Sequence, residues 1–370
     1  MNNPAPEKTF DPSAAGVNNG RYFGFPYTLE EAETVVYPVR WDVTTSYGDG
    51  AAKGPDAILE ASPQLDFYDF DYPRAWENRI GTHPGNALCA DNDLWREKAL
   101  TIIRAQEQGE DPVPYAPLLE EIDQACRQVN ACTRRDTAAL LEQGKNVVLL
   151  GGDHSCPLGY LEALAERHTS FSILHLDAHA DLREAYEGFT YSHASILYNA
   201  LQLPAVERLV QVGVRDLCPD EVQRIERSGG RIRLWDDYTL QRSLFEGSSW
   251  AQVCTRIVND LGENVYVSFD IDALDPSLCP GTGTPVPGGL SFHQASYLLC
   301  CLHESGRKVI GADLCEVSPG EAGGDWDANV GARVLYKLCS LLRACSGPAP
   351  SVEARADPTK MPAGDFPAGH

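Results

Sequence analysis

The chain has 370 residues, and its 53 Asp and Glu residues outnumber its 30 Lys and Arg residues, giving a formal net charge of −23. This acidity argues against binding to a nucleic-acid backbone or an anionic membrane surface, because both depend on Lys and Arg. An apolar content of 43% is enough for a sizeable core, in two domains of about 150 residues or in one large α/β domain. The excess of acids is typical of a solubility device or of a chain that attracts metal ions or cationic substrates.

The sequence also bounds the compartment. We find neither a secretory signal nor a run of about 18 apolar residues, so we expect no export and no membrane span. The 12 cysteines are scattered and include no C-x-x-C pair, which argues against zinc fingers and thioredoxin-like chemistry. We expect a cytoplasmic protein with free thiols.

In chain order, the sequence begins and ends with segments rich in Pro, Gly and polar residues, and we expect disordered tails over residues 1–20 and 347–370. Between them, short apolar runs rich in β-branched residues predict strands over residues 35–41, 146–150, 172–176, 209–214, 231–235, 265–269 and 308–317. Apolar residues at helical spacing predict helices after Pro157 and over residues 117–143, 291–304 and 329–345. Strands that alternate with helices indicate a parallel sheet covered by helices on both faces.

Residues 66–111 fit this alternation poorly, because they are rich in aromatic and polar side chains and show little periodicity. A segment of this length inside a compact domain is either a functional insertion or a long surface excursion. We favour a functional insertion.

Four polar motifs fall at the ends of predicted strands, at the edge of a parallel sheet where ligands bind. They are GGDHS at residues 151–155, DAHAD at 177–181, DID at 270–272 and the glutamate of EVSP at 316. In extended backbone, residues two apart point to the same side, so Asp177, His179 and Asp181 of DAHAD project together, as do the two acids of DID. With His154, they bring two imidazoles and four carboxylates to one place.

Four neighbouring carboxylates repel one another unless cations neutralise them. We therefore predict two divalent metal ions, and nitrogen and oxygen donors without thiolates favour Mn²⁺, Ni²⁺, Co²⁺ or Fe²⁺ over a structural zinc. Such a pair lowers the pKa of a bridging water and supplies hydroxide at neutral pH. Each motif alone is more typical of a turn or a cap, and Ser155 of GGDHS would then be an N-cap. His175, in the strand before DAHAD, is more typical of a hydrogen-bonded core histidine. The metal hypothesis therefore depends on their joint occurrence.

The four motifs, in this order, resemble those of the ureohydrolases, a family that includes arginase, agmatinase, formiminoglutamase, guanidinobutyrase and guanidine hydrolase. DAHADL together with SFDIDALDP is a highly specific pair, and the resemblance also includes SYGDGAAKGPDAI at residues 46–58 and GTGTPVPGGL at residues 281–290. It implies a single three-layer α/β/α domain over residues 21–346 with a mainly parallel, arginase-like sheet, assembled as a trimer or hexamer. It also implies attack of hydroxide on a guanidinium carbon, which releases urea and ammonia or an amine.

The resemblance assigns roles residue by residue. One metal would be held by His154, Asp177, Asp181 and Asp270, and the other by His179, Asp177, Asp270 and Asp272. Asp181 would also orient the hydroxide, Glu316 would grip the substrate guanidinium, and His193 would pass a proton to the leaving amine. Alternatively, His193 only caps the helix that starts near Ala194.

Free guanidine or a small alkylguanidine is the expected substrate. Residues 182–190 depart from the loop with which arginases read the amino-acid end of arginine, which makes arginine a poor candidate. Glu184 or Glu187 could receive the cationic tail of agmatine, and Arg183 the carboxylate of a guanidino acid, so these compounds remain alternatives. The insertion, VRWDVTTSYGDGAAKGPDAIL and GGDHSCPLGYL resemble the guanidine-hydrolase branch, often labelled agmatinase, whose members use nickel. The insertion could close the pocket, its own or a neighbour's, with side chains such as Trp76, Thr82, His83 and Trp95.

Two other classes stay open on the sequence alone. A relative that has lost catalysis and serves as a partner subunit would be expected to lack some ligands, yet all are present here. A single-zinc deacetylase would carry a Tyr and a paired-His motif, which we do not find.

Overall fold

The computed structural model describes residues 10–319 and 324–346 of the chain. The predicted tail over residues 347–370 and the first nine residues of the predicted amino-terminal tail lie outside this part. Within the described remainder of that tail, the ring of Phe10 packs edge-on against Phe25, with the centroids 4.4 Å apart, and against Phe67 at 5.2 Å. No helix in the described ranges is both long and apolar enough to cross a lipid bilayer.

The centre of the described structure is an eight-stranded parallel sheet with the strand order β2-β1-β3-β8-β7-β4-β5-β6. The strands are β1 (Thr34–Val39), β2 (Ile80–Thr82), β3 (Asn146–Gly151), β4 (Phe171–Leu176), β5 (Val206–Val212), β6 (Ile232–Trp235), β7 (Asn264–Asp270) and β8 (Lys308–Cys315). The seven predicted strands are confirmed. They could be predicted because near-continuous apolar runs are typical of strands that are covered on both faces.

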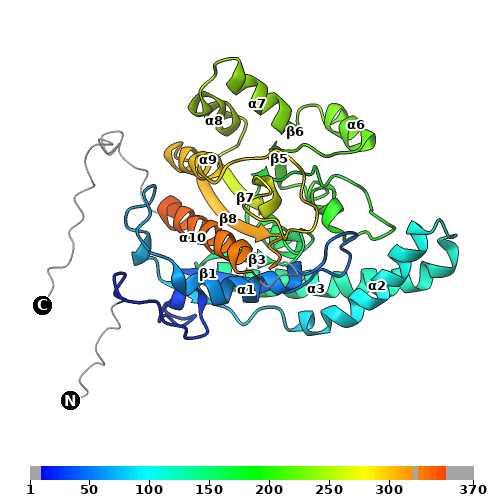
Figure 1. Cartoon of the computed structure of the whole chain (residues 1–370), viewed down its shortest axis with the longest axis horizontal. Helices are drawn as coiled ribbons and strands as arrows, with labels where there is room; N and C mark the ends of the chain where they lie inside the picture. The colour runs from blue at the N-terminus through cyan, green and yellow to red at the C-terminus, as the bar shows by residue number, and fades with distance from the viewer. Residues whose placement is uncertain (1–9, 320–323, 347–370) are drawn as a thin grey trace, which may run out of the picture.

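Helices cover both faces of the sheet (Figure 1). They are α1 (Gly54–Ala61), α2 (Asn92–Glu107), α3 (Ala116–Glu142), α4 (Leu158–Arg167), α5 (Ile196–Ala200), α6 (Pro219–Arg227), α7 (Asp237–Phe245), α8 (Trp250–Asn259), α9 (Phe292–Glu304) and α10 (Trp326–Ser346). Successive strand residues point to opposite faces, so Val148 and Leu150 of β3 belong to one buried cluster with residues of α8, α9 and α10, whereas Val147 and Leu149 belong to another with residues of α2, α3 and α4. The predicted α/β/α layering is confirmed.

Residues 66–111 contain regular structure although their sequence shows little periodicity. Residues Ile80–Thr82 form the edge strand β2, which pairs with β1, and α2 packs against α3. α2 escaped prediction because its buried apolar residues, among them Ala99, Ile102 and Ile103, are interspersed with many charged ones. β2 has only three residues, too few for a detectable alternation.

The strand order β3-β8-β7-β4 places the four motifs on four neighbouring strands. GGDHS begins with the last residue of β3, Glu316 follows β8, DID begins with the last residue of β7, and DAHAD follows β4. In the register of the sheet, Leu176 pairs with Phe269 and Asp270 pairs with Cys315, so these strands end at the same level. The polar residues that follow them therefore meet at one edge of the sheet.

Candidate metal centre and substrate cavity

The carboxylates of the centre are oriented by the turns that follow β4 and β7. The Asp177 carboxylate accepts a hydrogen bond from the backbone N–H of His179 at 2.6 Å, and Asp270 accepts one from the N–H of Asp272 at 2.8 Å. Asp272 in turn accepts the N–H of Ala178 at 3.0 Å, which ties the two turns together. Each of these three acids therefore has its Oδ1 held by backbone and its Oδ2 directed toward an imidazole.

Two imidazoles complete two groups of donors. His154 Nδ1 lies 3.0 Å from Asp177 Oδ2, 3.2 Å from Asp270 Oδ2 and 3.3 Å from Asp181 Oδ2. His179 Nδ1 lies 3.0 Å from Asp272 Oδ2 and 3.4 Å from Asp177 Oδ1. The structure thus brings all six residues together. His154, Asp177 and Asp181 group with His175, Asp177 also groups with His179 and Asp272, and Asp270 lies against His154.

The electrostatics of the cluster fit bound cations. Burial and the charges of Asp272 and Asp177 raise the pKa of Asp270 well above its usual value, and burial and Asp177 raise the pKa of Asp181 to about 6. Burial disfavours the charged form of His179, but the neighbouring carboxylates outweigh it and raise its pKa to about 12. Buried acids that hold protons this firmly create a negative potential, and divalent cations can replace these protons.

Three residues that the sequence did not mark as functional support the ligands. His175 is buried as expected, but its Nε2 lies 2.8 Å from Asp177 Oδ2, and Gln211 Nε2 lies 3.1 Å from its Nδ1. Ser268 Oγ lies 2.9 Å from His154 Nε2. His175 and Ser268 each stand two residues before a metal-ligand candidate on the same strand face, which is the signal that could have identified them.

Glu316 sits beside this cluster at the end of β8. Its Oε1 accepts the backbone N–H of His154 at 2.8 Å, and Thr282 donates its hydroxyl to the Glu316 carbonyl at 2.9 Å. Burial and the charge of Asp153 raise the pKa of Glu316 well above its usual value, so a cationic ligand would favour the ionised form.

Strained backbone coincides with the candidate site. Among the described non-glycine residues, only Phe23, Asp181, Glu187 and Glu316 have a positive φ, with 54° at Asp181 and 62° at Glu316. The loop after Glu316 also needs a glycine partner, because a Cβ on Gly54 would lie 2.0 Å from the Val317 carbonyl oxygen. Such strain persists where the surrounding contacts over-determine it, as they do at many functional sites.

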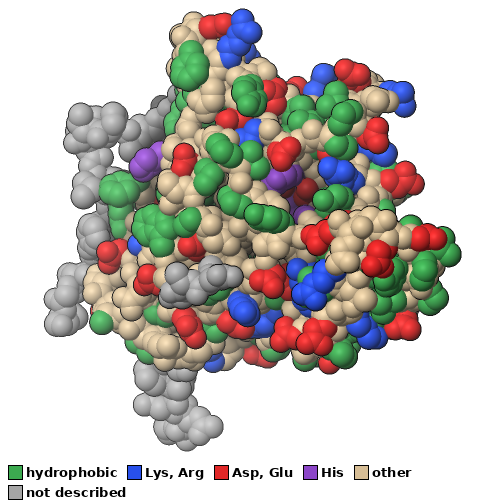
Figure 2. Space-filling model, turned by 45° about the vertical axis from the view of Figure 1, so that its right-hand side comes forward, with side chains coloured by type: hydrophobic (Ala, Val, Ile, Leu, Met, Phe, Trp, Pro, Cys, Tyr) green, Lys and Arg blue, Asp and Glu red, His purple; other side chains and the backbone are tan. Residues whose placement is uncertain are grey.

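A cavity of about 410 Å³ opens onto the centre, and His179, Asp181 and His193 lie on its wall. Figure 2 shows histidine and acidic side chains together in a hollow of this face. Burial, followed by the positive charges of His179 and His154, lowers the pKa of His193 to about 3, so its imidazole is neutral. His193 is not the helix cap, because Ser192 accepts the N–H of Ala194 at 3.3 Å in that role.

Two further expectations differ from the structure. Ser155 does not cap α4, because its hydroxyl donates to Asp153 Oδ1 at 2.5 Å instead. The side chains expected to close the pocket from the insertion lie elsewhere: the cavity is lined by none of Trp76, Thr82, His83 and Trp95. Closure of a neighbouring subunit's cavity by this segment stays a prediction.

The model of the arginase family matches residues 32–340. The chain belongs to the arginase family. It is 36% identical over 296 residues to the N(1)-aminopropylagmatine ureohydrolase of Thermus thermophilus, covering 80% of this chain and 85% of that one, and 27% identical to the agmatinase of Bacillus anthracis, covering 79% and 86%. The fold is similar to that of proclavaminate amidino hydrolase from Streptomyces clavuligerus, with a TM-score of 0.70, 24% identity and coverage of 90% of this chain and 100% of that one. This arginase-family chain is a hydrolase of the ureohydrolase class.

Proposed function

We propose that this protein hydrolyses a guanidinium compound to urea and ammonia or an amine at a centre for two divalent metal ions. The observation that carries the proposal is the convergence of two imidazoles and four carboxylates with Glu316 at the carboxyl edge of the sheet. When bound, the two ions would lower the pKa of a water and supply hydroxide at neutral pH. Mn²⁺ and Ni²⁺ both suit this set of nitrogen and oxygen donors.

The protein's own residues would hold the two ions, bind the substrate, orient the hydroxide and transfer a proton. One ion would be held by His154, Asp177, Asp181 and Asp270, and the other by His179, Asp177, Asp270 and Asp272. Glu316 binds the planar guanidinium, for which a carboxylate offers bidentate geometry. Asp181 orients the attacking hydroxide. His193, being neutral, accepts a proton and passes it to the leaving amine.

For the substrate, we propose free guanidine or a small alkylguanidine. Arg183 lies on the cavity wall with its guanidinium 4.8 Å from the Tyr186 ring centroid, and Tyr186 packs edge-on against His193 at 6.0 Å. A fixed positive charge at this place disfavours a substrate with a second positive charge. Glu221 also lines the cavity, but its two oxygens already accept the N–H groups of Leu182 and Cys218.

Agmatine is the second candidate, because two of the relatives are named for agmatine-type substrates. Its cationic tail would need a free acid along the cavity wall. Asp216 is exposed there and is the residue best placed for that role, whereas Glu184 and Glu187 do not line the cavity.

Urea release by the full-length protein, loaded separately with Ni²⁺ or Mn²⁺, tests both candidates. We expect kcat/KM for guanidine or methylguanidine to exceed that for agmatine, arginine and guanidinobutyrate. Far faster turnover of agmatine would overturn the guanidine proposal but keep the ureohydrolase proposal. No urea from any of them, in a protein that binds two metal ions, would overturn both. Light scattering of the same samples tests the predicted trimer or hexamer.

A further inference from the structure

Two loops without helix or extended strand form much of the cavity wall. Loop 42–47 contributes Ser46 and Tyr47, and loop 183–190 contributes Arg183 and Tyr186. Their side chains reach the cavity, so their backbone must be held in place from the opposite side. The insertion helix α2 makes hydrogen bonds to both loops.

The amino-terminal half of α2 holds loop 42–47. Asn92 and Asp42 exchange two hydrogen bonds of 2.9 Å, one through the backbone N–H of Asp42 and one through the two side chains. One turn later, Arg96 Nη1 donates to the carbonyl of Val43 at 3.2 Å and also to the carbonyl of Thr45. Asn92 and Arg96 are both buried. Because a buried guanidinium is costly unless it is hydrogen-bonded, these two carbonyls have a fixed place relative to α2.

The carboxyl-terminal half of α2 holds loop 183–190. Gln106 donates to the carbonyl of Glu187 at 2.7 Å, at a residue whose φ of 51° is strained for a side chain with a Cβ. Burial and the charge of Glu107 raise the pKa of Glu187, while the charge of Arg96 opposes this rise. The same charge contributes to the lowered pKa of His193. Arg96 therefore contacts loop 42–47 by hydrogen bonds, and its positive charge lowers the pKa of Glu187 in loop 183–190.

We propose that Arg96 is a positioning residue for substrate binding, and that helix α2 shapes the cavity from behind its wall. Arg96 does not line the cavity; its guanidinium sets the path of residues 43–45, and with it the places of Ser46 and Tyr47. The proposal rests on the proposed function only in that this cavity receives the guanidinium substrate. It gives the insertion a role without requiring it to move over the cavity mouth.

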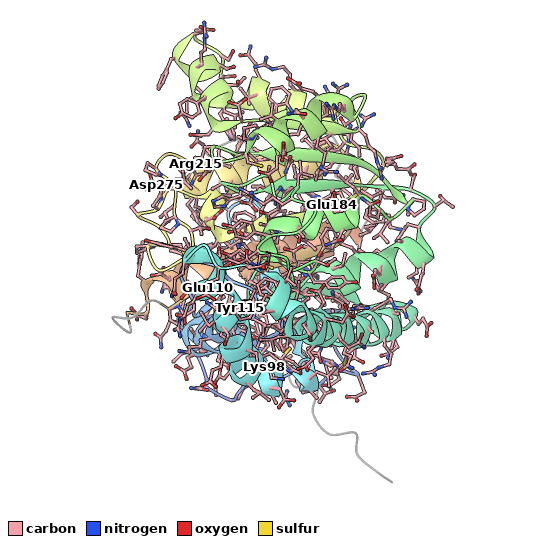
Figure 3. All side chains as sticks on the ribbon, turned by 90° about the vertical axis from the view of Figure 1, so that its right-hand side faces the viewer. Lys98, Glu110, Tyr115, Glu184, Arg215 and Asp275 are labelled. Atoms are coloured by element: carbon pink, nitrogen blue, oxygen red, sulfur yellow. The ribbon has the colours of Figure 1, made fainter. Side chains whose placement is uncertain are left out.

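The test compares Arg96→Met, which keeps the length of the side chain but removes its donors, with Lys98→Met on the same helix. Lys98 lies over the Trp95 ring and pairs with Glu121 at the surface. Figure 3 shows it on the outside of the molecule, below the turn that carries Glu110 and Tyr115. The measurements, on the metal-loaded full chain, are hydrogen–deuterium exchange of residues 42–47, metal content, and KM and kcat for guanidine and agmatine.

For Arg96→Met we expect faster exchange in residues 42–47, two metal ions per chain, unchanged protection of the sheet, and a KM raised about tenfold with a smaller change in kcat. Arg96→Lys should restore part of the KM, and Lys98→Met should change nothing. Unchanged exchange and KM in Arg96→Met, or equal effects of Lys98→Met, would overturn the proposal. If no guanidinium compound is turned over, the exchange measurement still decides the role of Arg96 while the proposed function fails.

If Arg96→Met does not fold, Gln106→Leu provides the same test at the other loop. It removes a single hydrogen bond, so we expect faster exchange confined to residues 186–190 and a smaller rise in KM. Unchanged exchange there and an unchanged KM would count against positioning by α2.

Discussion

The metal centre and the cavity wall border the same space but are built in different ways. The ligands of the centre lie at the ends of neighbouring paired strands, and hydrogen bonds to backbone N–H groups in the turns that follow orient their carboxylates. The wall consists of loops whose backbone is fixed by a helix from a distant part of the chain. We infer that the residues at the sheet edge carry out the reaction and that the loops select the substrate. Four substitutions test this division.

The largest loss of activity is expected from a substitution in the metal centre, Asp270→Asn. Asp270, like Asp177, is proposed to serve both ions, so activity should fall on the order of 10³-fold or more, because hydroxide at neutral pH depends on the metals. Metal content by elemental analysis should fall below two ions per chain. Asn resembles the protonated Asp that burial favours, so circular dichroism should stay unchanged. The exposed Asp275, whose carboxylate only bonds Ser277, gives the control Asp275→Asn, which should retain both metals.

Glu316→Gln should separate substrate binding from metal binding. Gln keeps the size of the side chain and the oxygen that accepts the His154 N–H, but it loses the charge that pairs with a guanidinium. We expect kcat/KM to fall about 10²- to 10³-fold, as for other charge-stabilising groups, with two metal ions retained. A loss of metal equal to that of Asp270→Asn would instead place Glu316 among the ligands.

His193→Asn tests the proton path at the border between centre and wall. We expect kcat to fall about 10²-fold, the lower range for general acid–base catalysis. Because the pKa of His193 is lowered to about 3, the imidazole stays neutral at all higher working pH values and does not titrate there. The variant's pH–rate profile between about pH 5 and pH 9 should therefore be scaled down without changing shape. Loss of an acid limb present in the wild type would contradict this account.

The smallest effect is expected on the wall, from Arg183→Gln. Removal of this positive charge should raise the ratio of kcat/KM for agmatine to that for guanidine by about tenfold, with little change for guanidine itself. Arg183→Lys keeps the charge and should leave the ratio unchanged. If both variants behave alike, the charge of Arg183 does not select the substrate.

The same division explains what the sequence could predict. The strands were visible as apolar runs, and the positions of DAHAD and DID at their ends predicted that these acids group at one edge. The local backbone is not the extended one expected, because Asp272 lies in a 3-10 helix and φ is 54° at Asp181. The hydroxyl of Ser155 was assigned to the wrong partner because Asp153, two residues away, competes for it. Arg96 could not be found, because it contacts backbone carbonyls more than fifty residues away in the chain. Every residue has a backbone carbonyl, so the residue type does not reveal which carbonyls accept a hydrogen bond from a side chain.

The strand order has a consequence for how the centre comes into being. β8 is the last strand in the described sequence, yet it lies between β3, which carries His154, and β7, which carries Asp270. A growing chain therefore holds the two halves of the centre apart until its last strand is inserted between them. Metal binding at the complete centre is then coupled to folding, because it requires the non-local pairing of β8 with both neighbours. The enzyme would become competent for metal binding in a single late event.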